Sequence, residues 1–286
     1  MILDGHIHIR DGAPDTAALA GRLEAAGVGG GVLISLPPAT FSGGAATKPP
    51  SERLQNVLAW CQASPNLHPF YWIDPLDPDA LEQVAAAASA GAKGFKIICD
   101  RYFPGDERVL AVLRAVAAAR RPVLFHSGIL WDGKPSSRYN RPAEFEALLE
   151  VDGLKFCLAH VSWPWCDECL AVYGKFLNAH SARPDLSVEM FIDLTPGTPV
   201  IYRKEVLGKL LTVGYDIENN LIFGTDCCAN DYNVEWTKKW QWRDRGIYRK
   251  LHVKRALVRQ IFAGNLRRFL GLATDKVEKT PLRQGE

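Results

Sequence analysis

Eight short apolar segments, rich in β-branched residues, alternate along this chain with longer stretches of helical character. The apolar segments, mostly bounded by Gly, Pro or Asp, cover residues 1–9, 28–36, 67–74, 94–99, 122–126, 154–160, 186–193 and 221–226. The helix-like stretches, several of which begin with Ser, Asp or Pro, cover residues 15–26, 51–63, 79–90, 107–120, 142–150, 167–179 and 203–213. This alternation predicts an α/β fold with a parallel sheet, and eight repeats predict a closed (β/α)8 TIM barrel in a single domain.

The length and composition agree with one barrel domain. A chain of 286 residues is close to the usual size of a (β/α)8 barrel, and 47% hydrophobic residues suffice for a large core. We expect residues 1–272 to form the metal-dependent barrel domain and the polar residues 273–286 to form a C-terminal tail. The Gly- and Ser-rich residues 37–50 are expected to form a mobile loop over the barrel mouth.

Charge and hydropathy limit the partners that we expect. The formal net charge of +2 gives no electrostatic case for nucleic acid. No apolar run reaches membrane-spanning length and no basic leader precedes the opening residues, so we expect a cytoplasmic location and no membrane partner. Seven cysteines, an odd number, fit a reducing compartment. A homo-oligomer is compatible with this composition.

Residues 238–259 form the one locally basic stretch, with tryptophans interleaved. Such a stretch can form a surface for a polyanion or a protein partner. The interpretation that we favour is a solvated helix whose aromatic side chains pack inward.

Histidine or aspartate ends several of the expected strands. His6 and His8 end the first, and alternation along a strand points both imidazoles to one side. His126 ends the fifth strand, His160 the sixth and Asp226 the eighth. Each has a simpler explanation, since a lone histidine is often a packing residue and an aspartate after a strand often caps a helix. Together, however, they converge on the C-terminal face of a barrel, and we favour a metal site there.

Several motifs, taken in order, resemble the amidohydrolase superfamily. They are residues 4–8 (Asp-Gly-His-Ile-His), the histidine that closes strand five, residues 159–160 (Ala-His), residues 224–226 (Gly-Thr-Asp) and residues 264–270. The chain is most similar to the amidohydrolase-related branch (amidohydrolase 2), which also holds the aminocarboxymuconate semialdehyde decarboxylase type. The resemblance spans nearly the whole chain and implies a barrel enzyme with a metal-activated water.

By that resemblance, His6, His8, His126 and Asp226 bind one divalent metal, and His160 contacts the metal-bound water or the substrate. Three neutral imidazoles and a carboxylate suit Zn²⁺, or another divalent ion such as Mn²⁺, with a position left open for water. Zinc lowers the pKa of such a water from 15.7 toward ~7. Either His160 or Asp226 can serve as the catalytic group that holds or passes the proton.

Lys96, on the fourth strand, leaves two alternatives for the number of metals. In binuclear members of the superfamily a lysine on this strand is carboxylated and bridges two ions, and His160 then becomes a ligand. The other alternative is a buried ion pair of Lys96 with Glu189 on strand seven. We favour one ion, because the branch that this chain resembles is usually mononuclear.

The loops after the strands supply the expected substrate contacts. Arg101 follows strand four, Arg138 lies in the loop after strand five, and Trp163 lies in the loop after strand six. Arginine beside aromatic side chains suits a planar or carboxylated small molecule. The simpler interpretation is that such arginines are solvated and such tryptophans cover the barrel mouth. Residues 193–199, after strand seven, are rich in turn formers and can shape the edge of a lid.

Cys166 and Cys169 have the CxxC spacing of a redox pair or of half a structural zinc site. No second CxxC accompanies them. We therefore favour two partly buried small side chains at the start of the helix after strand six. Cys227 and Cys228 directly follow Asp226 and can pack behind it, although adjacent cysteines form no motif.

Three functions remain open from the sequence. The first is a metal-dependent hydrolase whose activated water attacks an amide, lactone or ester carbonyl of a small organic acid. The second is a nonhydrolytic metal-dependent decarboxylase of an unsaturated or aromatic carboxylic acid. The third is a catalytically inactive barrel that binds metal.

Overall fold

Nine short parallel strands form a single sheet in the computed structural model, which describes residues 1–41 and 48–272. The strands are β1 (Asp4–His8), β2 (Gly31–Ile34), β3 (Leu67–Trp72), β4 (Gly94–Ile97), β5 (Val123–Phe125), β6 (Lys155–Leu158), β7 (Glu189–Asp193), β8 (Leu221–Ile222) and β9 (Cys227–Cys228). Their order is β8-β7-β6-β5-β4-β3-β2-β1-β9. The expected tail, 273–286, and residues 42–47 of the expected loop lie outside the described residues.

The two shortest strands, β8 and β9, together occupy the eighth position of the barrel. β8 pairs with β7, while β9 pairs with β1 through Ile7 and Cys227. Between them, Gly5 N donates to the carbonyl of Phe223 at 2.9 Å, and Asp226 N donates to the carbonyl of His6 at 3.0 Å. The eighth strand therefore bonds to the seventh and the first, and the predicted barrel fold is confirmed, with this strand interrupted rather than continuous from 221 to 226.

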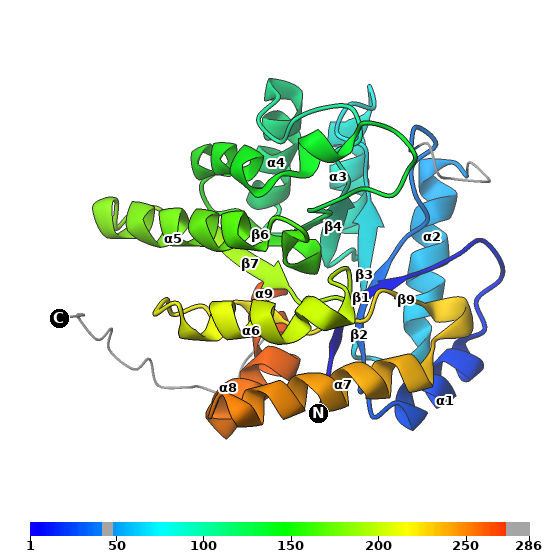
Figure 1. Cartoon of the computed structure of the whole chain (residues 1–286). Coiled ribbons are helices and arrows are strands. Elements are labelled where there is room, and N and C mark those ends of the chain that lie inside the picture. Colours follow the sequence, from blue (N-terminus) through cyan, green and yellow to red (C-terminus); the bar gives the residue numbers. More distant parts are fainter. Residues whose placement is uncertain (42–47, 273–286) are drawn as a thin grey trace.

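Helices surround the sheet and follow most of its strands (Figure 1). They are α1 (Thr16–Ala25), α2 (Pro50–Trp60), α3 (Ala80–Ser89), α4 (Glu107–Ala118), α5 (Cys166–Ala182), α6 (Arg203–Thr212), α7 (Val234–Lys250), α8 (Arg255–Arg259) and α9 (Asn265–Phe269). The predicted helix at 142–150 is instead the 3-10 segment η3 (Pro142–Glu150). Aspartates cap two of the helices, since Asp15 accepts from Ala18 N in α1 and Asp106 accepts from Arg108 N in α4.

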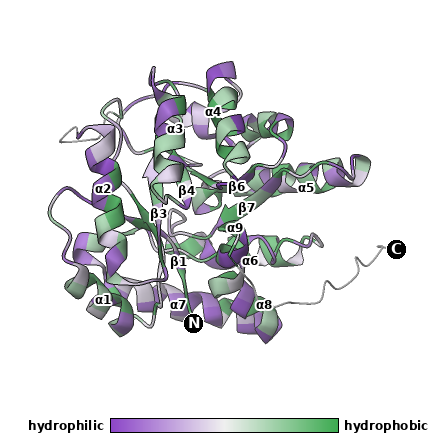
Figure 2. Ribbon diagram, turned by 180° about the vertical axis from the view of Figure 1, so that it is seen from behind, coloured by the Kyte–Doolittle hydropathy of each residue, from purple (hydrophilic) through white to green (hydrophobic). Residues whose placement is uncertain are grey.

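Apolar side chains lie on both sides of the sheet, as a barrel with an outer layer of helices requires. The strands are among the most hydrophobic parts of the ribbon, whereas the helices alternate between hydrophobic and hydrophilic residues (Figure 2). One cluster of buried residues joins strands to helices, and a second includes Val32, Phe70, Leu124 and Phe191 from β2, β3, β5 and β7. The short helix α9 adds Phe269 to this second cluster, with its ring 5.0 Å from that of Phe191. The strands therefore leave a packed interior below their C-terminal ends.

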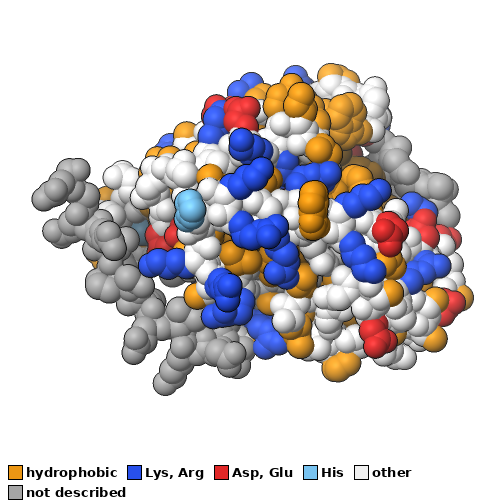
Figure 3. All heavy atoms as spheres, turned by 60° about the horizontal axis from the view of Figure 1, so that its bottom comes forward, with side chains coloured by type: hydrophobic (Ala, Val, Ile, Leu, Met, Phe, Trp, Pro, Cys, Tyr) orange, Lys and Arg blue, Asp and Glu red, His pale blue; other side chains and the backbone are white. Residues whose placement is uncertain are grey.

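The basic stretch predicted at 238–259 lies mainly on α7 and α8. Lysine and arginine side chains gather on this face of the molecule, with hydrophobic side chains between them (Figure 3). The expected inward packing is correct for Trp240, which is buried, but wrong for Trp242, which is 74% exposed. Both residues lie on α7, a helix that covers the barrel with only one of its faces. In the described part of the chain, no helix is both long and apolar enough to cross a membrane.

Candidate functional site

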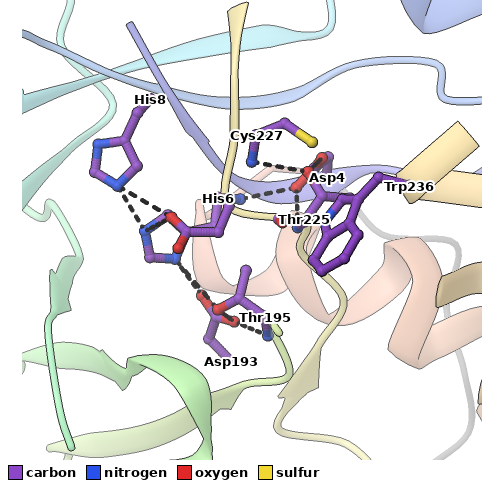
Figure 4. A network of polar contacts seen from close by, with 9 residues as sticks. Asp4, His6, His8, Asp193, Thr195, Thr225, Cys227 and Trp236 are labelled. Atoms are coloured by element: carbon purple, nitrogen blue, oxygen red, sulfur yellow. Dashed lines mark hydrogen bonds and ion pairs between the residues drawn. The ribbon is translucent and has the colours of Figure 1, made fainter. Parts of the chain in front are cut away.

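His6, His8 and Asp226 meet at the C-terminal end of the barrel, where β1 lies beside the start of β9. His6 Nε2 and His8 Nε2 are 3.1 Å apart, and Asp226 Oδ1 lies 3.6 Å from the first and 3.4 Å from the second. His6 is buried, while the side chain of His8 is 24% exposed and that of Asp226 41%. Figure 4 shows the two imidazoles turned toward each other. The predicted convergence of the first and eighth strands is therefore observed.

The spacing of these three donor atoms suits a metal ion. Two ligand atoms that each lie 2.0–2.2 Å from a tetrahedral ion are separated by about 3.3 Å. The three separations in the cluster, 3.1, 3.4 and 3.6 Å, fall around that value. Nitrogen and carboxylate oxygen are also the donor types that zinc accepts. Among the described residues, His6, His8 and Asp226 form the group whose geometry could hold a metal.

Asp193, at the end of β7, fixes the orientation of His6. Its Oδ2 lies 2.7 Å from His6 Nδ1, and its Oδ1 accepts hydrogen bonds from the backbone N and the hydroxyl of Thr195. Burial of the carboxyl opposes its ionisation, but its close contact with His6 and the hydrogen bonds that His6 and Thr195 donate outweigh this and lower the pKa of Asp193. With the proton on Nδ1 held by a carboxylate, the lone pair of His6 is on Nε2, which faces the cluster.

Asp193 was predicted only as part of a turn-rich segment, with no role at the site. A signal for it was present, because it is an aspartate at the end of a strand, the same criterion that selected Asp226. What the sequence did not show is that β7 brings it within hydrogen-bonding distance of a side chain on β1.

A second buried carboxyl, Asp4, ties the first strand to the eighth. It accepts from His6 N at 3.1 Å, from Thr225 N at 3.0 Å and from Thr225 Oγ1 at 2.6 Å (Figure 4). It also accepts from the hydroxyl of Tyr232 at 2.8 Å. Complete burial raises the pKa of Asp4 to about 7 despite these hydrogen bonds. The residue that follows Thr225, Asp226, has a positive φ of 59°. The hydrogen bonds that Thr225 donates to Asp4 thus hold the backbone where it turns Asp226 toward the histidines.

His126 and His160 also line the cavity above this cluster. His126 is 8% exposed, and its Nε2 is 3.2 Å from the carbonyl oxygen of Ile129. If Nε2 donates that hydrogen bond, the lone pair of His126 is on Nδ1. His160 lies with its ring centroid 5.2 Å from that of His126 and 5.3 Å from that of His6. The structure therefore brings His126 to the site but outside the group of three atoms that His6, His8 and Asp226 form.

The backbone around His160 adopts an unusual conformation. His160, Val161 and Ser162 have φ values of 61°, 48° and 54°, and Gly197 lies so close to His160 that an added Cβ would be 2.6 Å from the Cβ of His160. Burial lowers the pKa of His160 to about 4. Its Nδ1 is buried, and no residue within 1–41 or 48–272 forms a hydrogen bond with it. The segment thus holds a neutral imidazole beside the cavity, with one buried ring nitrogen that has no hydrogen-bond partner among the described residues.

Lys96 on β4 lies inside the barrel, on the floor of the cavity, and is 1% exposed. Burial lowers its pKa to about 8, and the charges of Asp226 and Asp193 partly oppose this shift. The predicted alternative of an ion pair with Glu189 is wrong. Glu189 begins β7, so it faces the opposite end of the barrel, where it pairs with Arg268.

The cavity has a volume of about 390 Å³ and opens between the loops that follow the strands. Trp163 lies on its wall, as expected, but Arg101 and Arg138 are not among the residues that line it. Arg101 forms ion pairs with Asp74 and, at 2.9 Å, with Asp100. Arg138 lies over the ring of Tyr139 at 4.7 Å. Beside the polar residues, the wall has an apolar and aromatic part that includes Phe41, Ile98, Ile129, Leu130, Trp131 and Pro196.

The CxxC pair lies where it was expected, at the start of α5. Cys166 is half-buried and Cys169 buried, and both are free thiols. Burial raises the pKa of Cys166 to about 11 and that of Cys169 to about 12. The thiols are therefore protonated near neutral pH, which argues against a reactive redox pair.

A barrel with a cavity at the C-terminal ends of its strands, and with converging histidines and aspartates, defines the class of (β/α)8-barrel enzymes. The chain belongs to the amidohydrolase family, whose sequence profile matches residues 47–272. This match includes His126, His160 and Asp226, while His6 and His8 precede it. A comparison with curated proteins finds no match.

Solved structures share this fold at low sequence identity. An amidohydrolase from Burkholderia multivorans with bound zinc has a TM-score of 0.66 and 14% identity, over 96% of this chain and 100% of its own. A probable 2-pyrone-4,6-dicarboxylic acid hydrolase from Acinetobacter baumannii, with citric acid bound, has a TM-score of 0.60 and 12% identity, over 95% and 99%. A 2,6-dihydroxybenzoate decarboxylase from Rhizobium has a TM-score of 0.60 and 15% identity, over 94% and 98%.

Proposed function

We propose that this protein is a metal-dependent hydrolase that cleaves the amide, lactone or ester bond of a small organic acid. The observation that carries the proposal is the cluster of His6 Nε2, His8 Nε2 and Asp226 Oδ1, with separations close to those of zinc ligands. Membership of the amidohydrolase family and the zinc in the Burkholderia multivorans structure support it. We propose zinc, or another divalent ion such as manganese, with one ion per chain.

In this proposal His6, His8 and Asp226 hold the ion, and His126 completes the set through Nδ1. A bound divalent ion supplies Lewis-acid chemistry, in which it lowers the pKa of a coordinated water and polarises a carbonyl. His6 is a suitable ligand, because its burial and the charge of Lys96 lower its pKa and keep the imidazole neutral. The chain thus offers neutral nitrogen donors and one carboxylate, as a zinc site requires.

The remaining polar groups of the cavity act on protons and charge. His160 lines the cavity and its lowered pKa keeps the imidazole neutral, so this ring can accept the proton of the attacking water and pass it to the leaving group. The ammonium of Lys96 lies on the floor of the same cavity, where it attracts a carboxylate of the substrate or negative charge that develops on it. Trp163 and its apolar neighbours exclude water around the reacting group.

Decarboxylation is the second candidate function. A buried cation in the cavity, Lys96, favours binding of a substrate carboxylate close to the candidate metal ligands. The Rhizobium decarboxylase is a protein of this fold that is named for removal of a carboxyl group. In that reaction His160 or Asp226 would deliver a proton to the carbon that loses CO2.

Metal analysis of matched variants tests the proposed site. We expect the purified protein to hold about one zinc or manganese ion per chain, His126→Ala to lose most of it, and His160→Ala to keep the metal but lose turnover. Equal metal loss in both variants would indicate a binuclear site. Wild-type protein that takes up no divalent metal would contradict the proposal.

Product assays then separate the two reactions. Lactones, amides and esters of small acids are screened for hydrolysis, and unsaturated or aromatic carboxylic acids for release of CO2. Hydrolysis without CO2 supports the leading proposal, whereas CO2 release without hydrolysis supports the second. Metal binding with neither product would indicate an inactive metal-binding barrel.

A further inference from the structure

We propose that Asp132 determines substrate specificity by accepting a hydrogen bond from the outer end of the substrate, and so selects a hydroxyl or amine there against a second carboxylate. The inference rests on the proposed function, because it concerns the same cavity. Asp132 lies in the loop after β5, which also contributes His126, Ile129, Leu130 and Trp131 to the cavity wall.

The two oxygens of Asp132 have different surroundings. Oδ1 is part of a local turn, in which it accepts from Lys134 N at 3.0 Å and from Ser136 Oγ at 2.8 Å. Oδ2 is shielded from solvent, yet no donor within residues 1–41 or 48–272 forms a hydrogen bond with it. A shielded carboxylate oxygen without a donor costs free energy. Asp132 itself lines the cavity, so a small rotation of its side chain lets a bound molecule supply the missing donor to Oδ2.

The loop that carries Asp132 is itself held in place, so the carboxylate has a defined position. Ser127 Oγ donates to the carbonyl of Asn140 and contacts Ser162 Oγ at 2.7 Å. Asn140 Nδ2 in turn donates to the carbonyl of Cys99 at 2.7 Å. These buried contacts fasten both ends of the loop to the segments that follow β6 and β4, and positional precision of this kind is what a specificity contact requires.

The arginines near the barrel mouth are not placed to neutralise a second carboxylate. Arg101 is paired with Asp74 and Asp100, whose side chains are 3% and 7% exposed, so its withdrawal toward a ligand would leave buried carboxylates unpaired. Arg138 stacks on Tyr139 and lies outside the lining of the cavity.

Charge is therefore distributed unevenly along the cavity. Among its described lining residues, Lys96 is the one lysine or arginine, and it lies on the floor. Asp132 is in the wall beside Trp131, whose side chain is 80% exposed. A ligand with one anionic group near Lys96, an aromatic or apolar body and a donor at its outer end satisfies all of these groups. A dicarboxylate places its second charge against Asp132.

Matched aromatic acids test this arrangement by isothermal titration calorimetry on the full chain as purified. The probes are 3- and 4-hydroxybenzoate, which carry a donor, and isophthalate and terephthalate, which carry a second carboxylate at the same positions. We expect at least one hydroxybenzoate to bind ten-fold or more tightly than its dicarboxylate counterpart, as a hydrogen bond to a charged group predicts.

The variant Asp132→Asn keeps an acceptor for the local turn and replaces the unpaired oxygen with an amide NH2. We expect it to lose the ten-fold preference and to bind the dicarboxylates more tightly than wild type does. Asp231→Asn, which changes an exposed aspartate that pairs with Arg10, is the matched control and should retain the wild-type preference. Arg138→Gln should leave dicarboxylate binding unchanged.

A wild-type preference for the hydroxybenzoates that Asp132→Asn removes supports the inference. The inference is overturned if neither hydroxybenzoate binds, if the dicarboxylates bind equally well, or if Asp132→Asn keeps the preference. Because binding is measured apart from turnover and metal content, its failure is distinct from that of the proposed function. A protein that shows the binding preference but holds no metal and cleaves no ester, lactone or amide would refute the proposed function and leave the role of Asp132 standing.

Discussion

The buried contact between Asp193 and His6 gives the sharpest test of how the candidate metal ligands are held. In the wild-type protein both donors of Thr195 converge on Asp193 Oδ1, while Oδ2 accepts from His6 Nδ1. In Asp193→Asn the amide oxygen can still accept from His6 Nδ1, but the NH2 group then faces the two donors of Thr195. His6 therefore loses either its partner or its fixed orientation. Changes to groups that orient a ligating histidine typically cost 10–100-fold in metal affinity, or about 1.4–2.7 kcal/mol.

Zinc affinity is measured by competition with a chromophoric chelator at neutral pH, where the lowered pKa of Asp193 keeps the wild-type carboxylate ionised. Thr195→Val is the matched control, because it removes one donor to Asp193 but leaves the carboxylate on His6. We expect about a three-fold loss or less in this control. Thermal unfolding of each variant shows whether the fold is retained. Wild-type affinity in Asp193→Asn, together with loss of zinc in His6→Ala, would refute the orienting role.

Three further predictions concern stability. Asp244→Ala leaves Arg203, its partner at 2.6 and 2.9 Å, as an unpaired buried charge and should lower the free energy of unfolding by about 3–5 kcal/mol in urea. Gly94→Ala places a methyl group 2.3 Å from a buried ring and should cost about 1–3 kcal/mol, whereas Gly246→Ala, in open space on α7, should cost nothing. Burial, with two nearby cations, lowers the pKa of His68 to about 4. The free energy of unfolding should therefore fall by up to about 3 kcal/mol between pH 6.5 and pH 4, and His68→Gln should reduce that fall.

Each of these predictions has an outcome that contradicts it. Unchanged urea unfolding of Asp244→Ala would show that the buried ion pair contributes little. Equal effects of Gly94→Ala and Gly246→Ala would remove the steric argument. Stability should fall with pH in the third prediction because the unfolded chain protonates His68 below pH 6.5, whereas the buried imidazole of the native state resists protonation. If His68→Gln leaves the pH dependence of the free energy of unfolding unchanged, that dependence comes from groups other than His68.

The barrel could be predicted because the evidence for it is local. Apolar runs and helix start signals define the elements, and parallel strands bring their C-terminal ends to one rim, so the residue order alone places His6, His8 and Asp226 together. The same rule of strand direction would have excluded Glu189 as a partner of Lys96, since it begins its strand.

The contacts that the sequence did not predict depend on side chains from separate strands. The pairing of Asp193 with His6 crosses from β7 to β1, and the pairing of Arg101 with Asp74 joins the segments after β4 and β3. Periodicity and turn signals carry no information about such pairs. The interruption of the eighth strand was equally hidden, because it follows from the positive φ of Asp226 and its tie through Thr225 to Asp4.

The seam of the barrel, where the first strand meets the eighth, has a consequence for biosynthesis. Both imidazoles of the first strand leave the ribosome early, but Asp226 is added only after roughly 220 further residues, on the order of 10–40 s later at 5–20 residues per second. During that interval the nascent chain presents a His-x-His pair without its carboxylate neighbour and without the barrel wall around it. The proposed ion would therefore meet its full set of ligands only in the finished chain, because the order of synthesis brings them together no earlier than closure of the barrel.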